Sequence, residues 1–169
     1  MTSSYASDNA LDLLIRDHRS LQQLFDQYEA QHGNAPPEEK QALADEICEQ
    51  FTRHADLEEQ WFYPAARKAL ADRDLIDEAE VEHASARELI AQIRAMHPGE
   101  PLYDAKVRVL GEQVAHHVEE EEKEMFPAVE KTGLDLDVIG QQMLAAKASS
   151  QRGINGGRAR GSSGQSAHR

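Results

Sequence analysis

The apolar residues of this chain recur three or four positions apart, a spacing that places them on one face of an α-helix. Four such stripes occur, over residues 11–28, 43–62, 76–93 and 107–128. Apolar and polar residues alternate nowhere over more than a few positions, as they would in a half-buried strand. The pattern therefore predicts an all-α protein in which four amphipathic helices bury their stripes against one another.

Segments rich in Gly and Pro separate these stripes, at residues 33–37 and 97–101. Pro64 is expected to bend or end the second helix, and Gly133 is expected to stop the fourth. Short links between long helices favour an up-down-up-down four-helix bundle. We predict an N-terminal extension over residues 1–7, the bundle over 8–132, a short C-terminal helix over 133–148 and a disordered basic tail over 149–169.

The second and fourth stripes carry the same local motif. Residues 54–64 align without gaps on residues 117–127, and both segments read His-x-x-x-Glu-Glu and end in an aromatic residue followed by Pro. The first and third stripes also match, because Asp17-His18 corresponds to Glu82-His83. The chain is therefore predicted to use one pair of helices twice.

Titratable side chains interrupt all four apolar stripes. They are His18, His54, Glu58, His83, His117 and Glu121. Residues four apart are neighbours on a helix surface, so each His-x-x-x-Glu unit points an imidazole and a carboxylate inward. Two buried, ionised carboxylates need compensating charge, which two dications would supply. Imidazole and carboxylate ligands suit iron, zinc or copper, so the pattern predicts a buried metal site.

With these residues the chain resembles the hemerythrin-like, HHE cation-binding family, over roughly residues 8 to 131. The resemblance is carried by the two His-x-x-x-Glu units with their extensions and by the single histidines of the first and third stripes. It implies a hemerythrin-like bundle around a non-haem di-iron centre, in which an oxo or hydroxo group bridges two iron ions. The implied ligands are His18 and His54 on one iron, His83 and His117 on the other, and Glu58 and Glu121 as bridges.

One position departs from the oxygen-carrying members of that family, which have a fifth histidine where this chain has Ala79. An open or water-filled position on the second iron is therefore expected, with Glu80 and His116 as candidate substitutes. A solvated helix face is the preferred interpretation of Glu80, and His116 lies about 100° around the helix from His117. The departure disfavours reversible oxygen carriage and favours a reaction with dioxygen, nitric oxide or hydrogen peroxide.

The expected function is thus that of a di-iron protein that binds or consumes a small oxidant, in oxidative or nitrosative stress or in oxygen handling. The sequence does not rank the diatomic gases and peroxide. An iron sensor or reservoir, whose metal-loaded bundle is read by a partner, is the alternative, and a metal-free interaction module is the third hypothesis. A ferritin-like site is set aside because only one Glu-x-x-His unit falls on a stripe.

The charge of the chain bears on which partners it can bind. The chain has 18 basic and 31 acidic residues, and the net charge of −13 combines −18 over residues 1–146 with +5 from residue 147 onward. Such an acidic body predicts no binding to nucleic acids or to anionic membranes. With no membrane-length apolar run and no signal segment at the N-terminus, a cytoplasmic location is expected, and the oligomeric state stays open.

The remaining buried candidates are interpreted as packing residues. Trp61, Phe62 and Tyr63 are expected to pack the end of the bundle rather than to line a pocket. Cys48 is the single cysteine, and its neighbour Ile47 on the second stripe predicts a small buried hydrophobe.

Overall fold

The computed structural model of the chain describes residues 8–158, so the predicted N-terminal extension and residues 159–169 of the predicted tail lie outside the described part. The segments are α1 (Ala10–Gln31), α2 (Pro37–Leu57), the π-helical η1 (Glu58–Phe62), α3 (Tyr63–Ala69), α4 (Asp74–Arg94), α5 (Tyr103–Glu120), the π-helical η2 (Glu121–Met125), α6 (Phe126–Glu130) and α7 (Leu136–Arg158). Strands are absent from residues 8–158, which confirms the all-α prediction.

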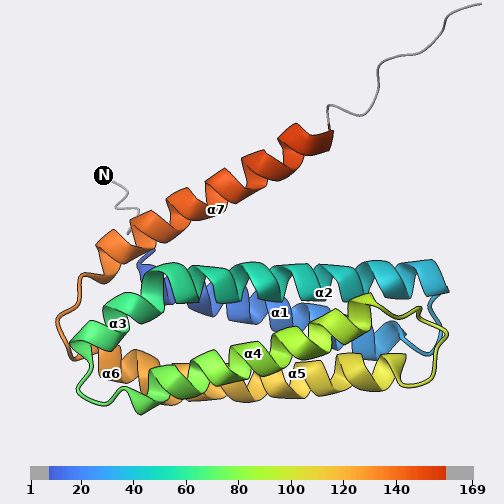
Figure 1. Cartoon of the computed structure of the whole chain (residues 1–169), viewed down its shortest axis with the longest axis horizontal. Helices are drawn as coiled ribbons and strands as arrows, with labels where there is room; N and C mark the ends of the chain where they lie inside the picture. Colours follow the sequence, from blue (N-terminus) through green and yellow to red (C-terminus); the bar gives the residue numbers. More distant parts are fainter. Residues whose placement is uncertain (1–7, 159–169) are drawn as a thin grey trace, which may run out of the picture.

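Four antiparallel rods form the bundle (Figure 1). Two rods are the single helices α1 and α4, and the other two are composite, α2–η1–α3 and α5–η2–α6. α1 packs against α2 and α5, and α4 packs against the same two helices. The predicted up-down-up-down order is therefore confirmed, and the predicted repeat corresponds to two pairs, each of a single helix followed by a composite rod.

Local sequence explains where the rods begin and end. Asn9 caps α1, since its side chain accepts from the backbone N–H of Asp12 while the Asp12 side chain accepts from that of Asn9. Pro37 occupies the first turn of α2, where its missing N–H costs nothing. Gly133, after α6, has a φ of +74°, a conformation that Gly adopts without strain. The predicted stop at Gly133 is correct to within a few residues.

The apolar interior consists of two clusters. One surrounds Phe25, Ile47 and Leu110, and the other surrounds Leu14 and Phe62. Each rod contributes to both clusters, and the predicted titratable residues lie where the two contributions meet along the rod. The polar site is therefore a layer across the bundle, enclosed by apolar packing on both sides.

The composite rods show how the chain passes Pro64, which was expected to bend or end the second helix, and the equivalent Pro127. Proline has no N–H to donate to the carbonyl four residues earlier, and its ring crowds that carbonyl. The rods continue by widening into π turns, where the Tyr63 N–H donates to the Glu58 carbonyl and the Phe126 N–H to the Glu121 carbonyl. A π turn inserts one residue, which corrects the predicted fourth stripe: Ala128 is half-buried and Val129 is fully buried instead.

The C-terminal helix corrects a second expectation. α7 spans Leu136–Arg158, so residues 149–158, predicted to be disordered, are helical. Ile139 and Met143 are buried against the bundle, whereas the side chains of residues 148–153 are exposed. Sequence pattern missed this extension because it has no apolar stripe. A helix that is already docked extends more easily than it nucleates.

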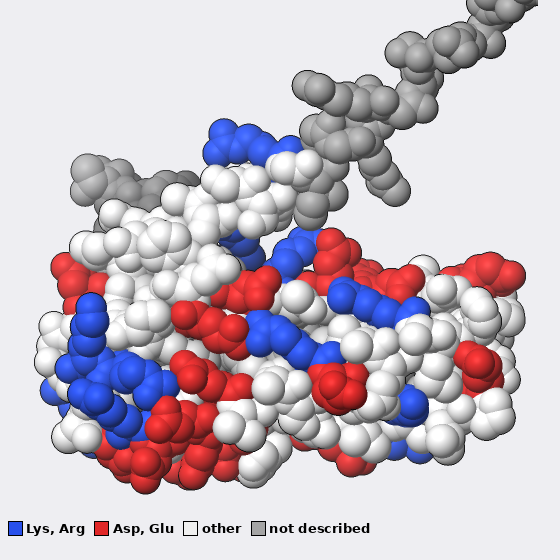
Figure 2. Space-filling view, in the orientation of Figure 1, with Lys and Arg blue, Asp and Glu red and all other residues white. Residues whose placement is uncertain are grey.

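Neither charge nor hydropathy marks a membrane segment. Within residues 8–158, each helix is either too short or too polar to cross a bilayer. Acidic and basic side chains are interleaved over the face of the bundle shown in Figure 2, while α7 is mostly uncharged.

Candidate metal centre

The six predicted site residues come together at the middle of the bundle. α1 supplies His18, α4 supplies His83, and each composite rod supplies one histidine and one glutamate. All six are between 0% and 2% exposed: His18, His54, Glu58, His83, His117 and Glu121. Polar side chains this deeply buried require partners.

The six side chains form two groups that share Glu58. One group contains His18, His54, Glu58 and Glu121, and the other contains Glu58, His83 and His117. Within each group the potential ligand atoms lie within 4.8 Å of one another. Glu121 also approaches the second group, because its Oε1 is 2.9 Å from His117 Nε2. The arrangement provides two adjacent positions for a cation, with both carboxylates between them.

The outer nitrogen of each histidine faces a carboxylate on a neighbouring rod. His54 Nδ1 lies 3.3 Å from Asp17, His83 Nδ1 lies 2.8 Å from Glu59, His117 Nδ1 lies 2.6 Å from Glu82, and His18 Nδ1 lies 3.1 Å from Glu122. An ionised carboxylate only accepts, so Nδ1 carries the hydrogen in each pair. The Nε2 lone pairs of the neutral rings then point inward, as in histidine metal sites.

These outer carboxylates were missed by the sequence interpretation, although a signal exists. Each is the sequence neighbour of one candidate ligand and contacts the histidine of the next rod. Asp17, beside His18, contacts His54, and Glu122, beside Glu121, contacts His18. The four contacts close a ring around the bundle, which only the relative placement of the rods defines.

Unpaired buried atoms provide the test of whether a cation fits. His18 Nε2, His54 Nε2, Glu58 Oε1 and Glu121 Oε1 are buried and have no hydrogen-bond partner in the described part of the chain. His54 Nε2 lies 3.0 Å from Glu58 Oε1, but that pair lacks hydrogen-bond geometry. All four atoms belong to the first ligand group. Four converging lone-pair atoms without hydrogen-bond donors fit a metal ion, and leaving them unpaired is costly.

The protonation states of the free protein follow from these contacts. Burial alone would raise the pKa of Glu58, but the charge of His54 and the nearby imidazoles of His117 and His83 hold it well below its usual value. Burial alone would lower the pKa of His54, but Glu58 and Asp17 raise it to about 10. The same balance raises the pKa of His117, chiefly through Glu121. Without metal, protons on imidazoles balance the buried carboxylates.

Tyr63 is the site residue that the sequence interpretation assigned to packing. Its hydroxyl donates toward Glu58 at 3.0 Å and Glu121 at 3.1 Å, and it lies 3.4 Å from His83 Nε2. Burial and the two carboxylates raise its pKa well above the usual value of 10.0, so the hydroxyl stays protonated in the free protein. The Glu58–His83–His117 group, which has one member fewer than the other group, thus has a phenol hydroxyl beside it.

The π turn explains why Tyr63 reaches the site. Residues five apart in an α-helix point in directions about 140° apart. The widened turn η1 instead links Tyr63 to Glu58 by an i to i+5 hydrogen bond and returns its side chain to the inner face. In the other repeat the equivalent Phe126 stacks on His18 at a centroid distance of 5.9 Å. One half of the centre therefore has a hydroxyl that the other half lacks.

The two candidate substitutes for the missing fifth histidine do not reach the centre. Glu80 is paired with Arg67 at 3.1 Å, with its side chain 48% exposed. The His116 side chain is 65% exposed and faces Glu82 and Glu120 on the outside of the bundle. Ala79 is buried in the apolar packing next to the site. The preferred interpretation of Glu80 as a solvated helix face is confirmed, and His116, which the sequence disfavoured, also stays outside; Tyr63 is the additional side chain that lies beside the second group.

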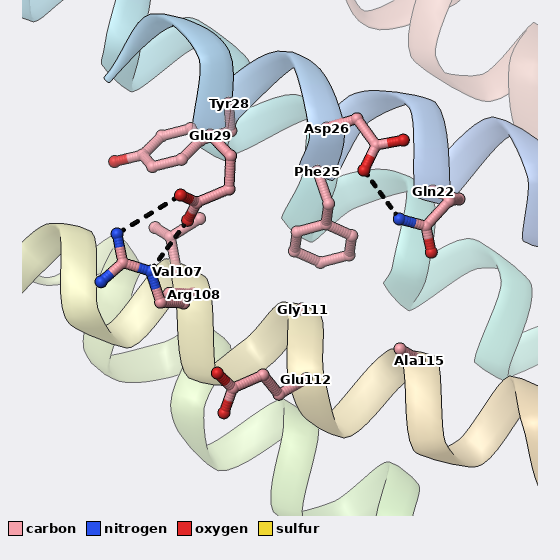
Figure 3. Close-up of a pocket in the computed structure, with 10 residues that line it drawn as sticks. All are labelled: Gln22, Phe25, Asp26, Tyr28, Glu29, Val107, Arg108, Gly111, Glu112 and Ala115. Carbon is pink, nitrogen blue, oxygen red and sulfur yellow. Dashed lines mark hydrogen bonds and ion pairs between the residues drawn. The ribbon is translucent and has the colours of Figure 1, made fainter. Parts of the chain in front are cut away.

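A separate groove lies between α1 and α5, away from these ligands (Figure 3). Its volume is about 230 Å³, and Phe25 faces Gly111 across it while Glu29 and Arg108 form an ion pair. A Cβ on Gly111 would lie 3.0 Å from Phe25, so Gly permits this close contact of the two helices. None of the six candidate ligands lines this groove.

Comparisons with known proteins agree with this geometry. The family model described as the hemerythrin HHE cation binding domain matches residues 9–129. A crystal structure of a hemerythrin HHE cation binding domain-containing protein from Mycobacterium kansasii is similar, with a TM-score of 0.71 at 26% sequence identity; the match covers 92% of this chain and 95% of that one.

Two curated relatives are similar in sequence. An uncharacterized protein of Mycobacterium tuberculosis is 29% identical over 142 residues, which cover 81% of this chain and 84% of the relative. A protein of Nostoc sp. named DNA nickase is 31% identical over 151 residues. That match covers 88% of this chain but 42% of the nickase, so the chain spans less than half of that relative.

Proposed function

Because the chain belongs to the hemerythrin HHE cation-binding family, we propose that its buried His/Glu cluster holds two iron ions and that the loaded protein binds or reacts with a small oxidant. The observation that carries the proposal is the convergence of four buried ligand atoms without hydrogen-bond partners. Two ionised carboxylates between the two positions add the negative charge that a pair of cations neutralises.

The residues divide between the two ions. His18 and His54 would hold one ion, His83 and His117 the other, and both glutamates would lie between them. Imidazole and carboxylate suit iron, which when bound supplies redox chemistry that protein side chains lack. The outer carboxylates keep the Nε2 atoms aimed inward, and the Tyr63 hydroxyl holds a proton beside the second position.

Burial favours a small oxidant as the reacting partner. The six ligands are at most 2% exposed, and apolar clusters enclose them on both sides. Dioxygen, nitric oxide and hydrogen peroxide need no open cleft, whereas a larger substrate does. The ligand set without a fifth histidine, together with the nearby phenol, favours a reaction over reversible oxygen carriage.

Iron content and optical spectra test this function. The iron-loaded protein is expected to hold two iron ions per chain and to show the near-ultraviolet absorption of a bridged diferric pair. Reduction is expected to remove that absorption, anaerobic addition of hydrogen peroxide to the reduced protein is expected to restore it, and nitric oxide is expected to give a different spectrum. His54→Ala should lose at least one iron, whereas the matched control His116→Ala, which removes an exposed neighbour of His117, should retain both.

Other outcomes would favour the alternatives. A loaded protein that gains melting temperature but consumes no oxidant would support an iron sensor or reservoir. A colourless protein that binds a single zinc ion would contradict the di-iron proposal. Unchanged or improved stability in both His54→Ala and Glu58→Ala, without metal binding in the wild type, would indicate a metal-free interaction module.

A further inference from the structure

α7 lies outside the four-rod bundle and outside the part of the chain that the family model matches, residues 9–129. Its first half packs on α1, α2 and η1, and its second half diverges from the bundle (Figure 1). Ile139 and Met143 are 6% and 2% exposed and join the apolar cluster that contains Leu14 and Phe62. The helix is therefore docked against one of the two apolar clusters that enclose the candidate metal centre.

Docking brings the backbones of α7 and α1 into close contact at Gly140. A Cβ at this position would lie 2.9 Å from the backbone nitrogen of Ala10 and 3.0 Å from the carbonyl oxygen of Asp8. Backbone atoms at these distances cannot yield as a flexible side chain can. The observed docking thus depends on glycine at residue 140.

Lys147 connects α7 to the metal centre. It lies one helical turn beyond Met143, and its ammonium group donates to Asp17 Oδ1 at 2.6 Å. The other oxygen of Asp17 accepts from His54 Nδ1 at 3.3 Å. Burial alone would raise the pKa of Asp17, but hydrogen bonds from His54 and Lys147 hold it below its usual value. The contacts form a continuous path from α7 to a candidate ligand.

The three other outer carboxylates have partners from the bundle itself. Arg19 of α1 pairs with Glu122 at 2.9 Å, and Arg87 of α4 pairs with Glu59 at 2.6 Å. His116 of α5 lies 3.8 Å from Glu82. Among these four carboxylates, Asp17 alone is paired with a side chain from α7, a helix that lies outside the four-rod bundle.

We propose that Lys147 is a positioning residue for the metal centre, and that docking of α7 and metal binding at the His18–His54 position are coupled. The inference rests on the proposed metal site. Lys147 fixes one oxygen of Asp17, so the other oxygen stays on His54 Nδ1 and the Nε2 lone pair stays aimed inward. By reciprocity, a metal ion on His54 stabilises the docked position of α7.

Cobalt(II) titration in the absence of oxygen tests the coupling, with absorption spectra that follow each binding step. Lys147→Met is expected to weaken one of the two steps about tenfold, the lower end of the effect of removing outer partners of metal ligands. Lys147→Arg should restore most of that loss. The matched control Arg152→Met removes a charge from the exposed part of α7 and should change neither step.

A second variant separates docking from the lysine itself. Gly140→Ala places a methyl group against the α1 backbone and should undock α7 while leaving Lys147 in the chain. It is expected to weaken the same binding step as Lys147→Met. Amide hydrogen exchange over residues 141–150 should slow on metal binding in the wild-type chain, and both variants should lose that slowing.

The outcomes discriminate between the inference and the proposed function. Two unchanged binding steps in both variants would overturn the coupling while leaving the metal site intact. Equal weakening of both steps by Lys147→Met, without rescue by Lys147→Arg, would indicate general loosening of the bundle and would also overturn it. A wild-type chain that binds no cobalt and no iron would overturn the metal site itself.

Discussion

At the scale of single residues, the centre depends on which nitrogen of each histidine is free. Hydrogen bonds from Nδ1 to carboxylates on the next rod settle this, since they leave Nε2 as the inward lone pair. Asp17 and Glu59 therefore help to set the orientation of the candidate ligands His54 and His83. The protons on His54 and His117 keep the free site electrically balanced until cations replace them.

Tyr63 provides a residue-scale prediction. Tyr63→Phe removes the hydroxyl that donates to Glu58 and Glu121. The metal-free protein should lose about 1–3 kcal/mol of stability, because both buried carboxylates lose a donor. Denaturant unfolding of the metal-free variant measures this loss. Phe126→Leu changes the equivalent ring, which has no hydroxyl, and controls for packing. Equal losses in the free energy of unfolding in the two variants would contradict the role assigned to the Tyr63 hydroxyl.

At the scale of elements, the two π turns set the form of the centre. Each begins at a glutamate of the cluster and ends shortly before a proline, so the same local device occurs in both repeats. The inserted residue rotates the following segment and brings Tyr63 and Phe126 to equivalent places beside His83 and His18. Because only one of these rings has a hydroxyl, two similar elements produce two candidate metal positions with different surroundings.

Substitution of the prolines tests this role of the π turns. Pro64→Ala restores the missing N–H, which permits a regular α-helix and moves Tyr63 away from Glu58. Metal binding at the Glu58–His83–His117 position is expected to weaken, as measured by cobalt(II) titration. Pro127→Ala alters the other turn, which holds no hydroxyl at the site, and serves as the matched control. Equal binding by Pro64→Ala and the wild-type chain would contradict this explanation.

At the scale of the whole molecule, the candidate metal centre and the end of the bundle away from α7 are held by different interactions. Away from α7, Asp104 at the start of α5 accepts from Tyr28 of α1 at 2.7 Å and from Lys40 of α2 at 3.3 Å. One carboxylate thus ties three rods together. Hydrogen bonds from Tyr28 and Lys40 overcome the opposing effect of burial and lower the pKa of Asp104.

The stability of the bundle should therefore fall in acid partly through Asp104. Its pKa in the folded chain lies below the usual value of 3.8, so its contribution is present above about pH 4 and is lost as the pH falls through the folded value. Asp104→Asn should cost about 1 kcal/mol at neutral pH and flatten the acid limb of the stability curve. Urea unfolding from pH 3 to 7 checks this, and an unchanged acid limb would contradict it.

The predicted absence of nucleic-acid binding stays a prediction, and the charge of the whole molecule supports it. The body is acidic, with −18 over residues 1–146, and Figure 2 shows basic side chains, including a cluster at the left end of the bundle, beside acidic ones. No binding to nucleic acids is therefore still expected. The Nostoc relative is named DNA nickase, but the match covers only 42% of that relative.

The sequence by itself determined the fold and six of the candidate site residues. A helical spacing of apolar positions, a repeated His-x-x-x-Glu motif and breakers between the stripes were sufficient to predict four rods and six buried titratable side chains. These features are local, because periodicity along one helix already decides which face is buried. The duplicated motif added the likeness to the HHE family, which the match over residues 9–129 confirms.

Only the tertiary structure decided what surrounds those six residues. Tyr63 reaches the site through a π turn that breaks the helical period, and the outer carboxylates act on rods other than their own. Lys147 contacts Asp17, which lies 130 positions earlier in the chain, and it stands on a helix whose next residues, 148–153, are exposed and have no apolar pattern. Such contacts depend on how rods are rotated and docked, which a one-dimensional period does not encode.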